Sequence, residues 1–187
     1  MRIGFFGGTF DPVHLGHIHG VVEAKIALDL DKIIMIPAKQ SPLKDESPTG
    51  DAHRIEMLKR AAAPYGFMEI LEWEITREGV SYTFDTVQYL KEEYPSDERF
   101  FLIGSDQYEG FHKWHRHEAL LKMMNFVVMS RRPDELAIDE RFTALSQPVM
   151  EISSTVIRER IKKGEVAMHQ LEPSVYQYIK EHRLYET

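Results

Sequence analysis

Short apolar runs separated by amphipathic stretches constrain the fold of this 187-residue chain most strongly. The runs are continuous rather than alternating, and they are rich in β-branched and aromatic residues. Both properties are typical of strands that are buried on both faces of a parallel sheet. The clearest runs are residues 3–6, 33–36, 100–103 and 126–129, and weaker candidates are residues 68–74 and 149–152.

Three stretches between these runs have the spacing of amphipathic helices. Asp51 is a candidate cap for the second of them, and Thr83 opens the third. Strands that alternate with helices predict an α/β fold with one doubly wound, mostly parallel sheet and helices on both faces. We find no repeat or composition break, so we expect a single domain over residues 1–187. The apolar positions of the three helices are Leu15, Ile18, Val22 and Ile26, then Ile55, Leu58 and Ala62, then Phe84, Val87 and Leu90.

Ligands of such sheets bind beyond the carboxyl ends of the strands, which points to residues 7–9, 104–106 and 130–132. Two polar stretches lack periodicity. We expect residues 39–50 to form a mobile surface loop. In residues 131–148, the apolar side chains of Phe142, Ala144 and Leu145 are spaced to pack a short helix.

The composition excludes several classes of protein. The chain has 23 Lys and Arg residues against 30 Asp and Glu residues, and the resulting net charge of −7 argues against a general nucleic-acid binder. It has no cysteine, which excludes disulfides, thiolate metal sites and a cysteine nucleophile. No apolar run approaches the ~20 residues of a membrane span, and the N-terminus does not resemble a signal peptide. We therefore expect a cytoplasmic protein without a membrane partner.

The segment GGTFDPVHLGH, residues 7–17, joins the first predicted strand to the first predicted helix. Its leading glycines let the backbone approach a bulky ligand, and the N-terminus of a helix attracts anions. The segment matches neither GxGxxG nor GxxxxGK[ST], so other side chains must supply donors to a phosphate chain. His14 and His17 can do so from one face of the first helical turn. They could also be ordinary polar residues of a helix start, or zinc ligands, which the lack of cysteine and of HExxH disfavours.

The segment ISSTVIR, residues 152–158, predicts a second helix start that can bind an anion. Arg158 stands four residues after Ser154 and therefore on the same helix face, where its guanidinium can bind a phosphate bidentately. The alternative interpretation is a helix cap followed by a solvated arginine.

Together the two motifs, about 140 residues apart, resemble those of the nucleotidyltransferase superfamily that carries (H/T)xGH. Within it, the chain resembles the bacterial nicotinate-nucleotide adenylyltransferases over essentially its whole length. Residues 79–86 (GVSYTFDT) are similar to the family's GxSYTxDT, residues 101–106 (FLIGSD) to its IG(A/S)D, and residues 113–115 (KWH) to its KW(Y/H). The resemblance implies a Rossmann-like nucleotidyltransferase fold and an enzyme of NAD biosynthesis that transfers an adenylyl group from ATP to nicotinate mononucleotide.

The resemblance also implies which residues bind the substrates. His14, His17 and Arg158 act on the triphosphate as catalytic residues. Trp114 stacks on the pyridine ring of the acceptor. The alternative is that its indole only packs against other side chains of the protein. The backbone N–H groups at Thr83 and His115 hold the acceptor carboxylate. The other implied ATP-binding residues are Gly7, Gly8, Thr9, Phe10, Gly16, Gly104, Asp106, Ser153, Ser154 and Thr155.

Lys44 and Arg132 are the candidates for the acceptor phosphate. Residues 37–44 (PAKQSPLK) depart from the family's PNxxPPHK because an asparagine and a histidine are missing.

The implied chemistry needs alignment and charge neutralisation rather than a covalent nucleophile. Mg²⁺ is the expected cofactor, carried by the phosphates of ATP and by water, with no metal ligand from the protein. The expected partners are ATP and nicotinate mononucleotide. The sequence leaves open whether the chain forms a homo-oligomer. Alternative functions are adenylyl transfer to nicotinamide mononucleotide or phosphopantetheine, and a non-catalytic nucleotide-sensing module. A protein or nucleic-acid adaptor has only Arg131, Arg132 and scattered histidines in its favour.

Overall fold

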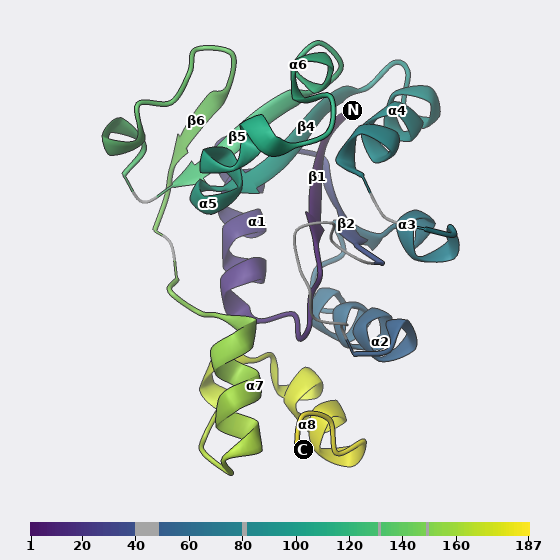
Figure 1. Cartoon of the computed structure of the whole chain (residues 1–187), viewed down its shortest axis with the longest axis vertical. Helices are drawn as coiled ribbons and strands as arrows, with labels where there is room; N and C mark the ends of the chain where they lie inside the picture. Colours follow the sequence, from purple (N-terminus) through teal and green to yellow (C-terminus); the bar gives the residue numbers. More distant parts are fainter. Residues whose placement is uncertain (40–48, 80–81, 131, 149) are drawn as a thin grey trace.

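The computed structural model describes residues 1–39, 49–79, 82–130, 132–148 and 150–187. Six strands form one sheet in the order β3-β2-β1-β4-β5-β6, and all five neighbouring pairs are parallel (Figure 1). The predicted doubly wound α/β sheet is therefore confirmed. The strands are β1 (Arg2–Gly8), β2 (Lys32–Pro37), β3 (Met68–Ile70), β4 (Glu98–Gly104), β5 (Asn125–Ser130) and β6 (Thr143–Ser146).

The helices connect successive strands or follow the last one. The α-helices are α1 (Leu15–Ala27), α2 (Asp51–Ala62), α3 (Trp73–Thr76), α4 (Thr83–Glu93), α5 (Ser105–Glu109), α6 (His117–Leu120), α7 (Ser154–Lys162) and α8 (Pro173–Glu181). Short 3-10 helices are η1 (Phe111–Lys113), η2 (Pro133–Leu136) and η3 (Met168–Gln170).

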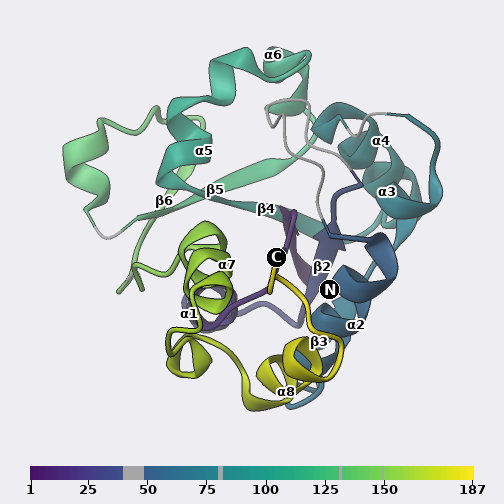
Figure 2. The ribbon, with the colours of Figure 1, turned by 60° about the horizontal axis from the view of Figure 1, so that its bottom comes forward.

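Helices cover both faces of the sheet, which explains why the strand sequences are continuously apolar. Successive residues of a strand point to opposite faces. Ile33 and Met35 of β2 pack in a cluster with residues of α1, α2, α7 and α8, whereas Ile34 and Ile36 pack in a second cluster with residues of α4, η1 and α6. Figure 2 shows α1, α7 and α8 on one side of β4 and β5, with α5 and α6 on the other.

The strand order places a topological switch point between β1 and β4. The chain leaves β1 for β2 on one side and later returns to β4 on the other side, and ligands of open α/β sheets bind at such a reversal. Phe6 pairs with Leu102, so Gly8 and Gly104, two residues further on, end these neighbouring strands at the same edge. Two of the predicted strand exits thus flank the switch point, and Ser130 ends the next strand, β5.

The predictions for the region around β6 are wrong. Residues 150–152 form no strand, and Val149 lies outside the described residues. The sixth strand instead contains Ala144 and Leu145, for which the spacing with Phe142 predicts a short helix. β6 pairs with β5 at the edge of the sheet and is mostly exposed, so it shows no apolar run for a sequence pattern to detect. The strand predicted at residues 68–74 ends at Ile70, and α3 follows it.

The helix predictions differ from the structure in their faces and caps. In α1 the buried residues are Ile18, Val21 and Ala24, whereas Ile26 is 69% exposed. The predicted stripe followed large apolar residues and so missed the small Ala24. Asp51 does not cap α2, because it is the first residue of the helix and Gly50 occupies the N-cap position; its carboxylate accepts a hydrogen bond from Arg54 instead. The buried Phe84, Val87 and Leu90 of α4 match the prediction.

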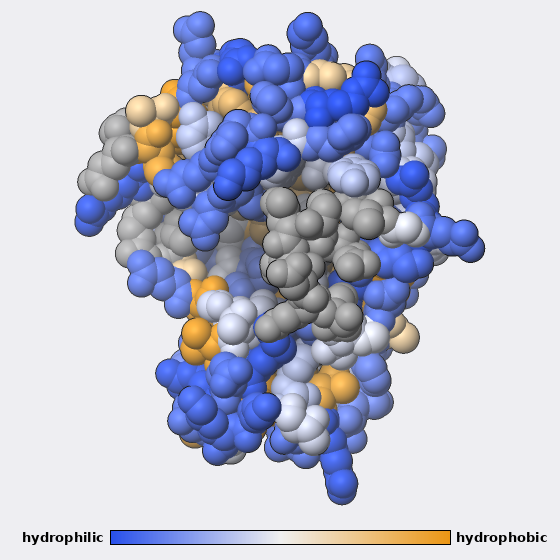
Figure 3. Space-filling model, viewed as in Figure 1, coloured by the Kyte–Doolittle hydropathy of each residue, from blue (hydrophilic) through white to orange (hydrophobic). Residues whose placement is uncertain are grey.

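The predicted surface loop lies mostly outside the described residues, and so does Lys44 within it. Its two ends are fixed: Lys39 Nζ donates to the carbonyl oxygen of Arg77 (2.8 Å), and the backbone N–H of Thr49 donates to Asp11 Oδ2 (3.0 Å). The face in Figure 3 is mostly hydrophilic, with hydrophobic residues in small separate groups. Among the described residues, no helix is long and apolar enough to span a bilayer.

Candidate active site

The start of α1 brings His14 and His17 together. His14 Nδ1 accepts the backbone N–H of His17 (3.3 Å), and His17 Nδ1 accepts the backbone N–H of His14 (3.2 Å). This reciprocal arrangement is a capping box, and the two rings stack with their centroids 3.6 Å apart. Because each Nδ1 is an acceptor, a neutral ring carries its proton on Nε2. Nε2 is therefore the atom of each histidine that can donate to a phosphate oxygen.

Burial sets the protonation state of His14. The side chain is buried, and this burial lowers the pKa of His14 to about 4. The ring is therefore neutral at pH 7. His14 offers a hydrogen-bond donor at this site rather than a positive charge.

We expect the neutral His14 to make stability depend on pH between about 6.5 and about 4. Its pKa in the folded state lies below the ordinary value of 6.5, so the unfolded chain takes up the proton first as the pH falls. The free energy of unfolding should then fall by about 3 kcal/mol across this window, at ~1.4 kcal/mol per unit of pKa shift. Above pH 6.5 both states are neutral, and this contribution is constant.

Urea unfolding of the wild type and of His14→Asn at pH 7.5 and pH 4 measures this contribution. Asparagine keeps an acceptor for the N–H of His17 but does not titrate. The variant should lose about 3 kcal/mol less stability than the wild type over this interval. Equal losses in the two proteins would show that His14 is not buried in the neutral form.

The start of α7 contacts the loop that precedes α1. Ser154 Oγ donates to the carbonyl oxygen of Pro12 (2.9 Å), and Arg158 Nη1 donates to the carbonyl oxygen of Asp11 (2.8 Å). Arg158 Nη2 also lies 3.4 Å from Thr155 Oγ1. Ser154 and Arg158 share one helix face, as their spacing predicts, and that face meets the first motif. The two motifs are thus in direct contact at residues 11–12.

The segment between β6 and α7 lies along α1. His19 Nε2 lies 2.7 Å from the carbonyl oxygen of Pro148, at hydrogen-bonding distance. A Cβ atom on Gly16 would lie 3.1 Å from His14 Nδ1 and 3.3 Å from the carbonyl oxygen of Met150. A side chain at Gly16 would therefore displace either His14 or this segment. Ser153, at the N-cap position of α7, makes no capping hydrogen bond with its side chain among the described residues.

The segment that follows β1 packs against the ring of His17. Phe10 has a φ of 51°, its side chain is buried, and its ring meets the His17 ring edge-on at 5.2 Å between centroids. Its side chain therefore packs under His17, which leaves only the backbone of Phe10 to meet a ligand. Gly8 packs on the same ring, since a Cβ there would come within 3.0 Å of Phe10. Gly7 and Thr9 are half-buried beside it.

Residues that the sequence predictions missed hold this loop in place. The buried Asp11 accepts the Tyr185 hydroxyl at Oδ1 (2.6 Å) and the Thr49 N–H at Oδ2. Arg54, which is fully buried, donates to the carbonyl oxygens of Thr9 (2.7 Å) and Thr49 (3.1 Å). Burial, and then the neighbouring Asp11 carboxylate, raise the pKa of Tyr185 far above its usual value, so its hydroxyl stays a donor.

The sequence contains a signal for Arg54 but none for Tyr185. Arg54 stands three and four residues before Met57 and Leu58, on the buried stripe of α2, where an arginine needs partners. The contact of Tyr185 with Asp11 joins residues 174 positions apart, and no local pattern reports such a contact.

A second group of predicted residues lies at the start of α4. The ring of His115 is 5.1 Å from that of Tyr82 and 6.0 Å from that of Phe84, so the segment with His115 lies against the helix start that includes Thr83. Trp114 is half-buried and packs on Phe111, with ring centroids 5.0 Å apart. Part of the Trp114 indole is therefore covered by packing against Phe111, and the rest of the ring is accessible to a ligand.

The remaining predicted residues follow the exits of β4 and β5. Gly104 precedes α5, and its N–H donates to Gln107 Oε1 (3.1 Å), while Asp106 is exposed in the first turn. Arg132 is exposed, and its N–H donates to Ser130 Oγ (3.1 Å).

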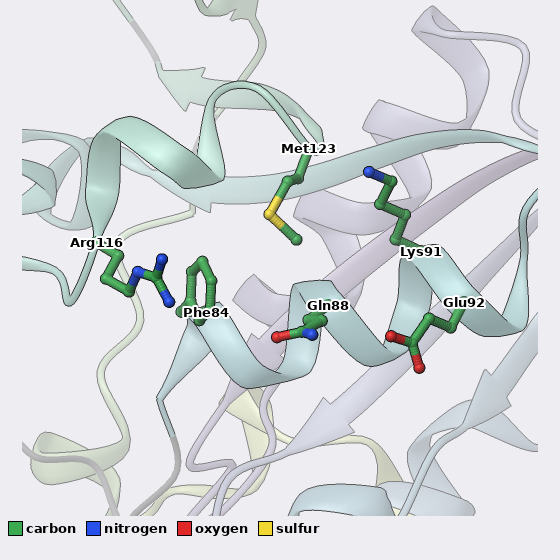
Figure 4. Close-up of a pocket in the computed structure, with 6 residues that line it drawn as sticks. All are labelled: Phe84, Gln88, Lys91, Glu92, Arg116 and Met123. Atoms are coloured by element: carbon green, nitrogen blue, oxygen red, sulfur yellow. The ribbon is translucent and has the colours of Figure 1, made fainter.

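A pocket of about 440 Å³ runs along α4, from Phe84 in its first turn to Glu92 in its last turn (Figure 4). The Arg116 guanidinium lies 4.2 Å from the centroid of the Phe84 ring in its wall. None of the predicted site residues lines this pocket, so it is separate from the site at the switch point. Its lining residues are Phe84, Gln88, Lys91, Glu92, Arg116 and Met123.

Comparison with known proteins agrees with this geometry. A family model described as cytidylyltransferase-like matches residues 5–160, which include the β1 exit, α1 and most of α7. The chain is therefore of the nucleotidyltransferase class that this model defines.

The curated relatives narrow the class. Nicotinate-nucleotide adenylyltransferase from Bacillus subtilis is 40% identical, with 100% of this chain and 99% of the relative covered. A protein from Bacillus pumilus, named as a probable nicotinate-nucleotide adenylyltransferase, is 41% identical with the same coverage. The chain belongs to the nicotinate-nucleotide adenylyltransferase family.

Solved structures support the fold. Plasmodium falciparum nicotinic acid mononucleotide adenylyltransferase complexed with NaAD has a TM-score of 0.80 at 23% identity, with 99% of this chain and 97% of that chain covered. The same protein complexed with APC has a TM-score of 0.82 at 21% identity and the same coverage.

Proposed function

We propose that this protein transfers the adenylyl group of ATP to nicotinate mononucleotide, which yields nicotinate adenine dinucleotide and pyrophosphate in NAD biosynthesis. The observation that carries the proposal is the contact between the starts of α1 and α7 at the switch point of the sheet, in a chain 40% identical to the Bacillus subtilis enzyme. We further propose that residues 1–187 act as one nucleotidyltransferase domain, and that this domain works in the cytoplasm.

In the proposed mechanism, an oxygen of the acceptor phosphate attacks the α-phosphorus of ATP. A bond forms between that oxygen and the α-phosphorus, and the bond to the β-phosphate oxygen breaks, so the electron pair leaves with pyrophosphate. Negative charge therefore grows on the leaving group, and fixed donors lower the barrier. Nε2 of His14 and of His17 and the guanidinium of Arg158 are those donors. They surround one loop, so they need little reorganisation as the charge moves.

Magnesium enters this proposal with ATP, as part of the substrate. Mg²⁺ prefers oxygen ligands, whereas imidazole and guanidinium groups suit phosphate oxygens instead. The carboxylate of Asp11, in the loop before α1, already accepts hydrogen bonds at both oxygens. No group of three or more potential ligands from His, Asp and Glu side chains occurs among the described residues. We therefore assign Mg²⁺ to the phosphates of ATP and to water.

The acceptor, in this proposal, lies at the start of α4. The first N–H groups of a helix have no partner within the helix, so those near Thr83 suit a carboxylate. The accessible part of Trp114 stacks on the pyridine ring, and His115 adds a second backbone donor. Lys44 and Arg132 are the proposed partners of the acceptor phosphate. Gly7, Gly8 and Thr9 are proposed to line the phosphates of ATP. Gly104 and Asp106 are proposed to lie in the crevice beside the ribose.

Pyrophosphate release with a panel of acceptors tests the proposal. The protein is incubated with ATP and Mg²⁺ and with nicotinate mononucleotide, nicotinamide mononucleotide or phosphopantetheine. We expect kcat/KM to be at least ~10²-fold higher for nicotinate mononucleotide, because an amide in place of the carboxylate leaves donors of the site unpaired. Equal values for the two pyridine nucleotides would remove the assigned acceptor. ATP binding without pyrophosphate release from any acceptor would establish a nucleotide-sensing module instead.

A further inference from the structure

The C-terminal segment reaches the loop between β1 and α1. After α8 ends at Glu181, Leu184 and Tyr185 pack on the hydrophobic cluster that includes residues of α1 and α2. The Tyr185 hydroxyl then donates to Asp11 Oδ1 over 2.6 Å. In Figure 2 the segment after α8 runs back from the edge of the molecule toward this loop. A residue near the end of the chain thus contacts the first motif.

Asp11 links this tyrosine to the groups that are assigned to ATP. One carboxylate oxygen accepts Tyr185 and the other accepts the N–H of Thr49, while the carbonyl oxygen accepts Arg158. The residue that Tyr185 holds is therefore also a direct hydrogen-bond partner of the Arg158 guanidinium. Asp11 also precedes His14 by only three residues, so a shift of Asp11 would also move the N-cap of α1.

The hydrogen bonds to the Asp11 carboxylate matter because this carboxylate lies beside cationic and proposed phosphate-binding groups. Asp11 is 7% exposed, and its carboxylate lies beside the groups proposed to hold a triphosphate. A buried carboxylate oxygen without a donor is costly and recruits the nearest cation. Arg158 already contacts Asp11 and is the cation at hand. Without the tyrosine hydroxyl, Arg158 would turn toward the Asp11 carboxylate and away from ATP.

We propose that Tyr185 is a positioning residue of the adenylyl-transfer site, because its hydroxyl holds the Asp11 carboxylate and so leaves Arg158 and His14 directed at the triphosphate. This inference rests on the proposed function. It extends the working site to the C-terminal segment, where none of the predicted site residues lies.

Tyr185→Phe tests the proposal because it removes only the hydroxyl and keeps the packed ring. We expect kcat/KM for ATP to fall about tenfold, with KM for the acceptor changed by less than about twofold. Tyr176→Phe is the matched control, since Tyr176 packs on the same cluster and its hydroxyl makes no hydrogen bond among the described residues. It should keep wild-type kinetics. A Tyr185→Phe enzyme with a lowered Tm but wild-type kinetic constants would reduce Tyr185 to a structural residue and overturn the proposal.

A double-mutant cycle with Asp11→Asn tests the route through Asp11. If Tyr185 acts through this carboxylate, the double variant loses no more activity than Asp11→Asn alone. If the losses of activity in the two single variants multiply in the double variant, Tyr185 acts independently of Asp11, and the assigned route through the Asp11 carboxylate is overturned. The ATP Kd of the same variants separates a failure of the proposed function from a failure of the positioning role of Tyr185. If the wild type releases no pyrophosphate, the proposed function fails, while a weaker Kd in Tyr185→Phe still supports the positioning role and an unchanged Kd overturns it.

Discussion

His17→Ala should lower kcat by about 10²–10³-fold, because it removes a fixed donor from the charge that grows on the leaving pyrophosphate. The side chain is held for this role by the His14 N–H at Nδ1, by the stacked His14 ring and by the Phe10 ring. Nε2 therefore has one orientation before ATP binds. Steady-state pyrophosphate release at saturating ATP and nicotinate mononucleotide measures the loss.

The same substitution removes half of the capping box, so its effect on folding must be separated. Loss of such a cap costs about 1 kcal/mol of stability, which leaves a stable domain folded at 25 °C. Urea unfolding of His17→Ala checks this value. His169→Ala, in the short helix η3, removes an exposed histidine and should keep the wild-type rate. Normal turnover by His17→Ala would exclude the role assigned to His17.

Arg158→Ala should lower kcat/KM for ATP by about 10²–10³-fold, because it removes the guanidinium that we propose binds the triphosphate. Arg158→Lys should recover little of this loss. One N–H of Arg158 already donates to the Asp11 carbonyl oxygen, and the planar guanidinium can still present two parallel N–H groups to a phosphate, whereas a lysine ammonium cannot make this bidentate contact.

Arg160→Ala is the matched control for this prediction. Arg160 lies two residues further along α7, and its Nη1 donates to the carbonyl oxygen of Val166 (3.0 Å), away from the first motif. It should keep the wild-type kcat/KM within about twofold. Similar kinetics for Arg158→Ala and Arg160→Ala would show that the contact between the two motifs serves packing alone.

The sequence predicted those parts of the fold that bury large apolar side chains. β1, β2, β4 and β5 were found because both of their faces are covered and their runs are continuous. β6 was missed because an exposed edge strand needs no such run. The buried face of α1 was placed incorrectly because small residues such as Ala24 also pack against the sheet.

For the site, spacing predicted which side chains lie on one helix face but not what holds them. His14, His17, Ser154 and Arg158 were identified from two motifs, and the structure brings them to one loop. The low pKa of His14 depends on burial, which a sequence pattern does not report. The support from Arg54 and Tyr185 depends on contacts made only after the chain has folded. Sequence motifs thus identified residues proposed to contact ligands better than residues that position them.

Transfer of radiolabel from ATP tests the central claim most directly. The protein is incubated with Mg²⁺, nicotinate mononucleotide and ATP labelled at either the α- or the γ-phosphorus. We expect label from the α-position to appear in the dinucleotide and label from the γ-position to appear in pyrophosphate, in equal amounts. Appearance of γ-label in the acceptor, or of labelled AMP with no dinucleotide, would contradict adenylyl transfer at this site.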